Sequence, residues 1–448
     1  MNPDSPKNKA PHRGIVRFLL LIWTNFDTIL SIGLSVLAAW FATFGGKPEY
    51  AVGATATALG IVAFGTLKDR AARDQIFTQL RDVEAVVRRL LDKTVADDFF
   101  SRKSSERDLI IKADKELVLV QETGRLIAET CRQELLAFVR RGGRLRWVAV
   151  ADSNYIAGFM AFRNANLITP DLMIDRMQSG LRMIEILANE AGDFASNIEV
   201  RFFPYPVDIT VVIRDPRHIS LKDREALVRL QGFQVTFDDK LDFALNAYDS
   251  RTVYDLYLKQ VENIWRLSSK CLFLTGEPGV GKSTLLEKAV CEIRNRSSWF
   301  EVVGFFTREI RNGSERIGFE TVTVDGQHIG QLALKTESGT YELNSATMKE
   351  LVLPAIDKGL AHRRALLIVD EIGPIQLQNP EFQRLMRIAM EDTSLSILGI
   401  VAAKGHSFLG YIHHHIRSRL ISVTEINRDS LLEQIIEEFV PRQAGPDD

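Results

Sequence analysis

Glycines, a lysine and two hydroxyl residues occur together at a spacing that suits phosphate binding. They follow an apolar run, Leu272 to Thr275, and lead into a predicted helix, Ser283 to Arg294. Glycines let the backbone turn tightly, so that its N–H groups converge on a phosphate at the positive end of the helix. Lys282 is expected to reach the β and γ oxygens, and Ser283 to hold Mg²⁺. The residues predicted to bind nucleotide are Gly276, Glu277, Pro278, Gly279, Val280, Gly281, Lys282, Ser283 and Thr284.

Two acidic residues end a second apolar run, Ala365 to Val369. A continuous apolar run predicts a buried parallel strand, and open α/β sheets bind ligands at the carboxyl ends of such strands. Asp370 is predicted to meet Mg²⁺ through water. The side chain of Glu371 points in a different direction from that of Asp370, and it is predicted to deprotonate the water that attacks the γ-phosphate. For the glycine motif, the alternative is a loop that matches the phosphate-binding pattern by chance. For the second apolar run, it is an ordinary strand that ends in polar residues.

Length and composition indicate a globular chain of several units. The chain has 448 residues, 46% of them hydrophobic and 25% charged, and a formal net charge of −2. This length predicts two or three units, and this charge provides no general basic field for nucleic acid. Three isolated cysteines, Cys131, Cys271 and Cys291, are interpreted as reduced core residues of a cytosolic compartment, without disulfide or zinc.

The first 67 residues have the pattern of a basic tail and a membrane hairpin. Residues 1–25 are predicted to form a basic cytoplasmic tail, and residues 26–67 a hairpin of two transmembrane helices joined by a turn at 45–49. Each apolar stretch would span roughly 27 to 28 Å, close to the hydrocarbon thickness. Basic residues flank both ends of the hairpin, which predicts a multi-pass protein of the cytoplasmic membrane with both termini in the cytoplasm. A cleaved signal peptide and a buried soluble hairpin are the alternatives.

Residues 68–112 are predicted to form a helical stalk. Apolar residues from Ile76 to Leu90 recur in alternating steps of four and three, interleaved with charged residues. This short heptad stripe either pairs with another subunit or packs on the next domain. Small residues spaced by four in the apolar stretches would let the membrane helices pack closely. A homo-oligomer is therefore expected.

Strand and helix patterns alternate in residues 113–268, which predicts an α/β layer fold. The predicted strands are 117–120, 145–150, 198–203 and 209–213, and the predicted helices are 125–140 and 172–187. The region resembles one lobe of the phospholipase D-like superfamily, whose signature is H-x-K-x(4)-D. When the chain is aligned with this signature, Asp208 stands at the histidine, Thr210 at the lysine and Asp215 at the aspartate. No H-x-K occurs in the chain. The resemblance thus implies a degenerate lobe for dimerisation or ligand sensing, without that chemistry.

Residues 269–440 resemble the small P-loop nucleoside-triphosphatase family that includes the cancer-related nucleoside-triphosphatase. Besides the phosphate loop, the matching blocks are 304–311, 316–320, 325–326, 369–373 and 427–429. The resemblance implies a three-layer α/β/α P-loop domain that hydrolyses ATP or other nucleoside triphosphates with Mg²⁺. Where the family often has Lys-Met-Glu, this chain has Pro374, Ile375 and Gln376, which puts the turnover rate in question. Residues 441–448 are predicted to be a disordered tail.

Several further residues have two interpretations. Arg308 ends a predicted strand near the ligand edge, where it would stabilise γ-phosphate charge, or it is a surface arginine paired in a hairpin. Lys404 follows the predicted strand 397–403 as a sensor-type residue or as a solvated lysine. His413, His414 and His415 would point in different directions on a helix, which favours packing over a metal site. Phe300 and Phe306 are predicted to fill a sheet core, so nucleic acid is not an expected partner.

The sequence therefore favours a membrane-anchored nucleoside-triphosphatase in which Glu371, Lys282 and Arg308 are catalytic and Ser283 and Asp370 hold the metal. A nucleotide-regulated signalling or defence effector with slow turnover is the first alternative. A nucleoside or nucleotide kinase is the second, and it is disfavoured because Glu371 occupies the position of a water-activating base.

Overall fold

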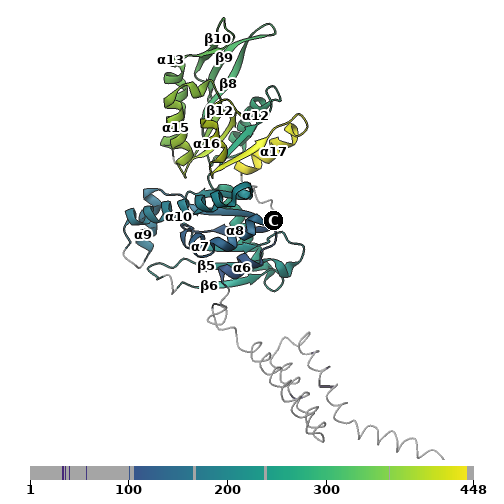
Figure 1. Cartoon of the computed structure of the whole chain (residues 1–448). Coiled ribbons are helices and arrows are strands. Elements are labelled where there is room, and N and C mark those ends of the chain that lie inside the picture. The colour runs from purple at the N-terminus through teal and green to yellow at the C-terminus, as the bar shows by residue number, and fades with distance from the viewer. Residues whose placement is uncertain are drawn as a thin grey trace, which may run out of the picture. The chain divides into compact units, whose positions relative to one another are not determined.

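The computed structural model describes residues 33, 34, 36, 40, 57, 100, 105–164, 168–236, 240–362 and 364–440. The described residues from Phe100 onward belong to one compact unit with two mixed β-sheets, one in each of two lobes (Figure 1). The predicted basic tail, nearly all of the membrane hairpin, the stalk up to residue 104 and the tail 441–448 lie outside the described residues. Within the described part of the chain, no helix has both the length and the apolar content needed to cross a membrane.

The sheet of the middle lobe has six strands in the order β3-β2-β1-β4-β5-β6. β1, β2 and β3 are parallel, whereas β4, β5 and β6 are each antiparallel to the preceding strand in this order. The strands are β1 Glu116–Val120, β2 Arg144–Val150, β3 Ile198–Phe203, β4 Ile209–Arg214, β5 Glu225–Leu230 and β6 Asp242–Asn246. The first four strands agree with the strands predicted from the sequence, whereas β5 and β6 were not predicted.

Helices complete the middle lobe, and one prediction about them was wrong. The predicted helix 125–140 is two helices, because Cys131 has φ −115° and ψ 17° and interrupts it. The helices are α6 Glu106–Lys112, α7 Arg125–Thr130, α8 Arg132–Arg140, α9 Asn154–Arg163, α10 Pro170–Ala191 and α11 Arg251–Leu267. Leu109 and Ile110 of α6 are fully buried, so this helix is part of the lobe's core.

Asp215 has a structural role at the end of β4. Its φ is +48°, and its carboxylate accepts hydrogen bonds of 2.7 to 2.9 Å from the backbone N–H groups of Asp114, Lys115 and Glu116. This carboxylate therefore satisfies the donors of the turn before β1. Asp208, by contrast, has a side chain that is 92% exposed.

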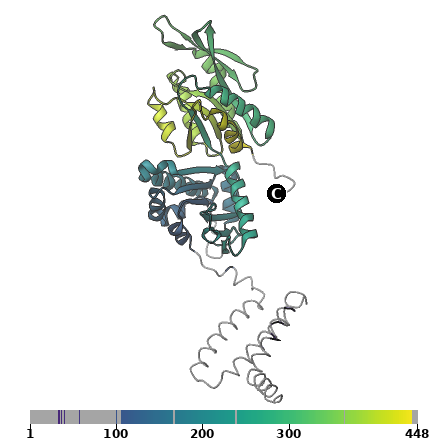
Figure 2. The same ribbon diagram turned by 90° about the vertical axis from the view of Figure 1, so that its right-hand side faces the viewer.

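The sheet of the C-terminal lobe has eight strands in the order β11-β10-β9-β8-β12-β13-β7-β14. β8, β12, β13, β7 and β14 are parallel, and β9, β10 and β11 extend the sheet antiparallel from β8. The β8–β9–β10 ribbon projects beyond the helices (Figures 1 and 2). The strands are β7 Cys271–Thr275, β8 Glu301–Asn312, β9 Glu315–Thr323, β10 Ile329–Lys335, β11 Tyr341–Leu343, β12 Ala365–Ile372, β13 Ser396–Val401 and β14 Ser418–Ser422.

Two hydrophobic clusters form on this sheet because successive side chains of a strand point to opposite faces. Phe273 of β7 joins one cluster with helices α14, α15 and α16, and Leu272 and Leu274 join the other with α12 and α17. Phe306 belongs to the second cluster and Phe300 packs against it, as predicted. The helices are α12 Lys282–Arg296, α13 Ser345–Thr347, α14 Leu353–Ala361, α15 Pro380–Glu391, α16 Phe408–His414 and α17 Arg428–Phe439.

Shorter helical turns complete the described elements. The 3-10 turns are Gly192–Asn197, Leu221–Asp223 and Gln376–Gln378, and a π-helical turn is Met348–Val352. Cys131 and Cys271 are buried, as predicted, but Cys291 is exposed on α12, so its interpretation as a core residue was wrong.

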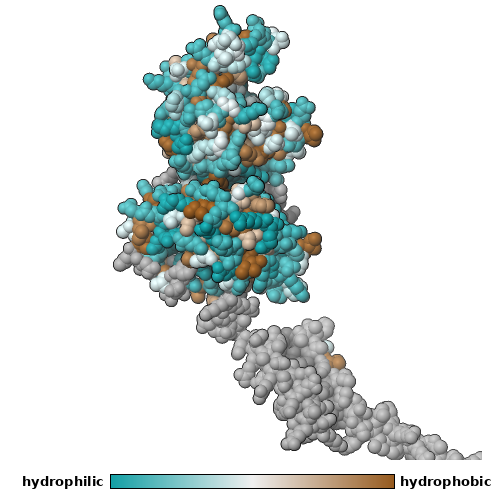
Figure 3. All heavy atoms as spheres, viewed as in Figure 1, coloured by the Kyte–Doolittle hydropathy of each residue, from teal (hydrophilic) through white to brown (hydrophobic). Residues whose placement is uncertain are grey.

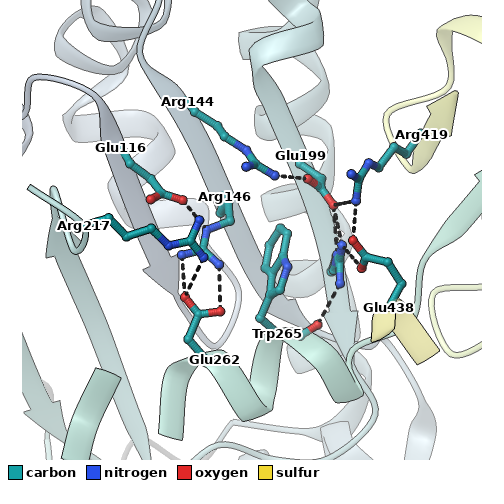
Figure 4. A network of polar contacts seen from close by, with 10 residues as sticks. Glu116, Arg144, Arg146, Glu199, Arg217, Glu262, Trp265, Arg419 and Glu438 are labelled. Atoms are coloured by element: carbon teal, nitrogen blue, oxygen red, sulfur yellow. Dashed lines mark hydrogen bonds and ion pairs between the residues drawn. The ribbon is translucent and has the colours of Figure 1, made fainter. Parts of the chain in front are cut away.

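Buried and half-buried charges join the two lobes in a set of residues that we call the seam: Glu199, Arg201, Lys270, Arg419 and Glu438. Figure 4 labels Glu199, Arg419 and Glu438 of this set. Arg201 of β3 lies 2.6 Å from the carboxylate of Glu199 and 2.7 Å from that of Glu438, which is on α17. Lys270, just before β7, donates to the backbone carbonyl of Glu438. Burial lowers the pKa of Lys270. The seam therefore ties α17 to the middle lobe through charge-assisted hydrogen bonds.

Helix α11 is held on the middle sheet by a second ion-pair group (Figure 4). Arg146 of β2 makes two hydrogen bonds to Glu262, of 2.8 and 3.0 Å, and an ion pair of 2.8 Å to Glu116. The ring of Trp265 lies 4.0 Å from the guanidinium of Arg201, so α11 also contacts the seam. The face in Figure 3 shows hydrophobic side chains scattered among hydrophilic ones on both lobes.

Candidate active site

The predicted phosphate loop lies between β7 and α12, as the sequence pattern indicated. Gly276, Gly279 and Gly281 have φ values of 144°, 84° and 91°, which L side chains rarely adopt. A Cβ at Gly276 would lie 2.4 Å from the carbonyl oxygen of Val423, so this position requires glycine for space as well. Lys282 donates from Nζ to the carbonyls of Gly276 at 2.9 Å and Glu277 at 2.8 Å. Its ammonium group therefore lies within the turn of the loop.

The loop and the acidic end of β12 meet at Asp370. The hydroxyl of Ser283 donates to Asp370 Oδ1 at 3.0 Å, and the backbone N–H of Thr307 donates to Oδ2 at 3.1 Å. Asp370 is only 1% exposed, and burial raises the pKa of its carboxyl to about 7, although both hydrogen bonds lower it. Three separate elements, α12, β8 and β12, thus fix the position of one carboxylate.

A hydroxyl and a carboxylate in contact fit a magnesium ion. Mg²⁺ prefers oxygen ligands and is held by one or two protein groups together with phosphate oxygens and waters. Ser283 and Asp370 supply such oxygens, side by side at the end of the phosphate loop.

Glu371 occupies a β-bulge. Asp370 pairs with Ile400 and Ile372 with Val401, so Glu371 is the extra residue of the β12–β13 ladder. Bulges of this kind re-aim a side chain next to active sites. The carboxylate of Glu371 makes no hydrogen bond to any of the residues that the structure describes. Burial raises the pKa of Glu371, and Lys282 and Arg316 lower it. Glu371 is therefore a half-buried carboxylate without a hydrogen bond to the described residues, and the charge of Lys282 lowers its pKa.

Arg308 extends from β8 toward α12. Its Nε lies 3.2 Å from a carboxylate oxygen of Glu287, and its side chain is 49% exposed. Glu287 is one helical turn beyond Ser283, and it contributes to raising the pKa of Asp370. The ion pair with Glu287 therefore holds Arg308 near Asp370.

Two residues with contacts at the site were not predicted from the sequence. Thr307 holds Asp370 by its backbone N–H and also donates its hydroxyl to the carbonyl of Asp370. Arg428, the first residue of α17, donates to the carbonyl of Val280 in the phosphate loop at 3.4 Å. Both residues lie in sequence blocks that match the family, and this match is the feature of the sequence that could have identified them.

The remaining residues considered in the sequence are Lys404 and the three histidines 413–415. Lys404 is exposed after β13, and Gly405 beside it lies against Pro374, in the loop that follows Glu371. His413 contacts the carbonyl of Ala402 at 3.1 Å. Burial lowers the pKa of His415 to about 4.

Comparisons with known proteins place similarity on the C-terminal lobe. A sequence profile of the family described as NTPase matches residues 271–436. Nucleoside-triphosphatase THEP1 of Thermotoga petrophila is 32% identical over 170 residues, which cover 37% of this chain and 90% of that relative. The cancer-related nucleoside-triphosphatase homolog of Bos taurus is 33% identical over 181 residues, covering 37% and 94%.

Among solved structures, the crystal structure of THEP1 from Aquifex aeolicus is similar at 31% identity, with a TM-score of 0.33, and covers 37% of this chain and 96% of that one. The family match leaves the middle lobe unassigned, so its resemblance to the phospholipase D-like superfamily remains a sequence prediction.

Proposed function

The chain belongs to the NTPase family through residues 271–436, and from this premise we propose that it hydrolyses ATP or another nucleoside triphosphate to the diphosphate and phosphate with Mg²⁺. The observation that carries the proposal is the 3.0 Å contact between Ser283 and Asp370 at the end of the phosphate loop. It brings the phosphate-binding and acidic motifs, far apart in sequence, to one place.

Each residue has a defined part in the proposed reaction. The glycine loop and Lys282 bind the phosphate oxygens, and Ser283 and Asp370 hold the metal. Mg²⁺, when bound, would neutralise charge that develops on the phosphate oxygens. Glu371 orients a water molecule and takes its proton as the water oxygen attacks the γ-phosphorus. Arg308 stabilises charge on the transferred group, which requires it to exchange its contact with Glu287 for a phosphate oxygen.

Replacing Glu371 tests this assignment. Glu371→Gln keeps the size and polarity of the side chain but removes the base, so nucleotide binding should persist while turnover falls by roughly two to four orders of magnitude. Lys282→Ala is the matched binding variant, because it removes the ammonium from the loop and should abolish nucleotide affinity. Calorimetric titration with nucleotide and steady-state phosphate release measure the two effects. Unchanged hydrolysis in Glu371→Gln would remove Glu371 from the mechanism.

A nucleotide-regulated effector with slow turnover is the second candidate, and one observation favours it. Helix α17 contacts the phosphate loop through Arg428 and the middle lobe through Glu438, so it links the nucleotide site to the seam. The same assay separates the candidates. Fast phosphate release supports the hydrolase, tight binding with negligible release supports the effector, and transfer to added nucleosides supports a kinase.

We also propose that residues 26–67 anchor the chain in the cytoplasmic membrane, on the strength of their two uncharged apolar stretches. Deleting residues 1–67 should move the protein from the membrane pellet to the supernatant without loss of hydrolysis, because the catalytic residues all follow residue 275. Full-length protein that stays in the supernatant without detergent would contradict the anchor. Pairing between copies through the stripe Ile76 to Leu90 remains a prediction.

A further inference from the structure

The middle lobe contains a cavity of about 320 Å³ beyond the carboxyl end of β1. Its lining residues come from the loop after β1, from helices α6, α7, α9 and α10, from strands β4 and β5, and from Gln231 and Lys240 between β5 and β6. Its volume is at the lower end of the range for small-molecule sites, roughly 300 to 1,000 Å³. The cavity is thus large enough for a small metabolite.

The cavity lies where the strand order of the sheet reverses. The chain passes from β1 to β2 and β3 on one side, and β4 then pairs with the other side of β1. Val120 pairs with Val211, which places Thr210 beside Gln121 at this edge. Open α/β sheets bind ligands at such a reversal, outside the carboxyl ends of the strands. Gln121 and Thr210 both line the cavity.

The lining carries one unmatched positive charge. Its three carboxylates each form an ion pair with a lining cation: Glu106 with Arg229 at 3.4 Å, Glu122 with Lys240 at 3.6 Å, and Glu129 with Arg125 at 2.8 Å. Behind the lining, Arg163 also pairs with Glu122 and Asp242 with Arg229, which adds one charge of each sign and leaves the balance unchanged. The fourth cation, Arg176 of α10, has no ion pair with any of the residues described. A guanidinium group matches the planar oxygen pairs of carboxylates and the oxygens of phosphate.

Neutral polar groups and apolar side chains form the rest of the wall. Gln121 is 9% exposed, and its Nε2 has no hydrogen-bond partner among the residues that the structure describes. A buried amide donor without an acceptor costs about 1 to 3 kcal/mol. Thr210 and Gln231 lie 3.5 Å apart and add hydroxyl and amide groups, and Met160 and Met173 add apolar surface.

We propose that this cavity binds a small polyhydroxylated organic anion with a single carboxylate or phosphate group, its acidic group on Arg176 and its hydroxyl groups on Gln121, Thr210 and Gln231. The hydroxyl oxygens of such a molecule supply the acceptor that Gln121 lacks. A phosphomonoester carries a charge of about −1.5 to −2 at pH 7, and a nucleoside triphosphate carries more, spread over three phosphate groups. One unmatched guanidinium therefore suits a single acidic group and not a triphosphate. The site is therefore separate from the nucleotide site in both location and charge.

A series of six-carbon sugars that differ in charge tests the proposal on the full chain. Thermal unfolding is measured with gluconate, glucose 6-phosphate, glucose and glucosamine at matched ionic strength. A ligand that binds only the folded state raises Tm as its concentration increases. At least one of the two anions should raise Tm above the values with glucose and glucosamine, and the larger of the two anion shifts identifies carboxylate or phosphate as the preferred group.

Two variants and a control locate the effect. Arg176→Gln should weaken anion binding by about 10- to 100-fold, the range for a lost hydrogen bond to a charged group. Arg182→Gln, an exposed arginine of the same helix outside the cavity, should bind as the wild type does. Gln121→Met removes the unpaired donor, so it should raise the baseline Tm but reduce the anion shift. The proposal is overturned if neither anion exceeds glucose, or if the shift survives Arg176→Gln.

Discussion

Arg308 shows how one side chain connects the sheet to the candidate site. Its ion pair holds it against Glu287 of α12, one turn beyond Ser283, and Glu287 contributes to raising the pKa of Asp370. A cation in this position is suited to reach a γ-phosphate after a change of side-chain rotamer, because an arginine side chain is long and flexible.

Arg308→Ala should therefore lower turnover by about 100-fold, the loss expected for one electrostatic donor at a transition state, with little effect on nucleotide affinity. Arg311→Ala is a matched control, because Arg311 is on the same strand and pairs with Glu309 outside the site. Steady-state kinetics of both variants measure the difference. Equal turnover of the two would assign Arg308 to the Glu287 ion pair alone.

At the scale of the elements, helix α9 lies between a contact that joins the two lobes and the cavity of the middle lobe. The backbone N–H of Asp152, two residues before α9, donates to the hydroxyl of Thr393 in the C-terminal lobe at 3.0 Å. At the other end of α9, Met160 and Asn164 line the cavity. One ten-residue helix thus runs from an inter-lobe contact to the proposed anion site.

The elements around the phosphate loop were predicted from sequence because each has a strong local pattern. β7 is a continuous apolar run, glycines mark the turn, and α12 follows with helical periodicity. The exposure of Cys291 could have been predicted from the same helical periodicity. The buried residues of α12 are Leu285, Leu286, Ala289, Val290 and Ile293, and position 291 falls outside that helical phase. Assigning it by residue type alone gave the wrong answer.

Other features depend on contacts that no local pattern reports. β5 was missed because it mixes Glu225 and Arg229 with apolar residues, and Arg229 is satisfied by Glu106 and Asp242 from other elements. The break at Cys131 has neither proline nor glycine to mark it. Thr307 reaches Asp370 because β8 and β12 pair in one register, with Phe305 opposite Val369. The sequence supplies the residue, and only the folded sheet supplies its partner.

At the scale of the whole molecule, the seam determines how the lobes are joined, and Glu438 is its central anion. Burial raises the pKa of Glu438, but Arg201, Lys270 and Arg419 lower it more, to about 2. The ordinary value is 4.5, so the folded state holds the charged form more strongly than the unfolded state does. This stabilisation is complete above pH 4.5 and is lost as the pH falls toward 2.

Glu438→Gln should accordingly lower the free energy of unfolding at pH 7 by about 3 kcal/mol, the value that corresponds to this shift in pKa. The variant leaves the cations of the seam without their shared carboxylate, which is the costly way to break a buried ion pair. As the pH falls toward 2, the deficit should shrink, because wild-type Glu438 becomes protonated as well. Urea unfolding of both proteins, followed by circular dichroism between pH 7 and 3, measures the difference.

Glu433→Gln provides the control on the same helix. Glu433 pairs with Arg296 at 2.9 Å, but its side chain is 61% exposed, so its loss should cost less than about 1 kcal/mol at any pH. The difference between variant and wild type isolates one carboxylate, since all other acidic groups titrate in both proteins. If Glu438→Gln loses no more stability than Glu433→Gln, the seam does not hold the lobes together. A pH-dependent loss confined to Glu438→Gln would assign this part of the stability to the contact between α17 and the middle lobe.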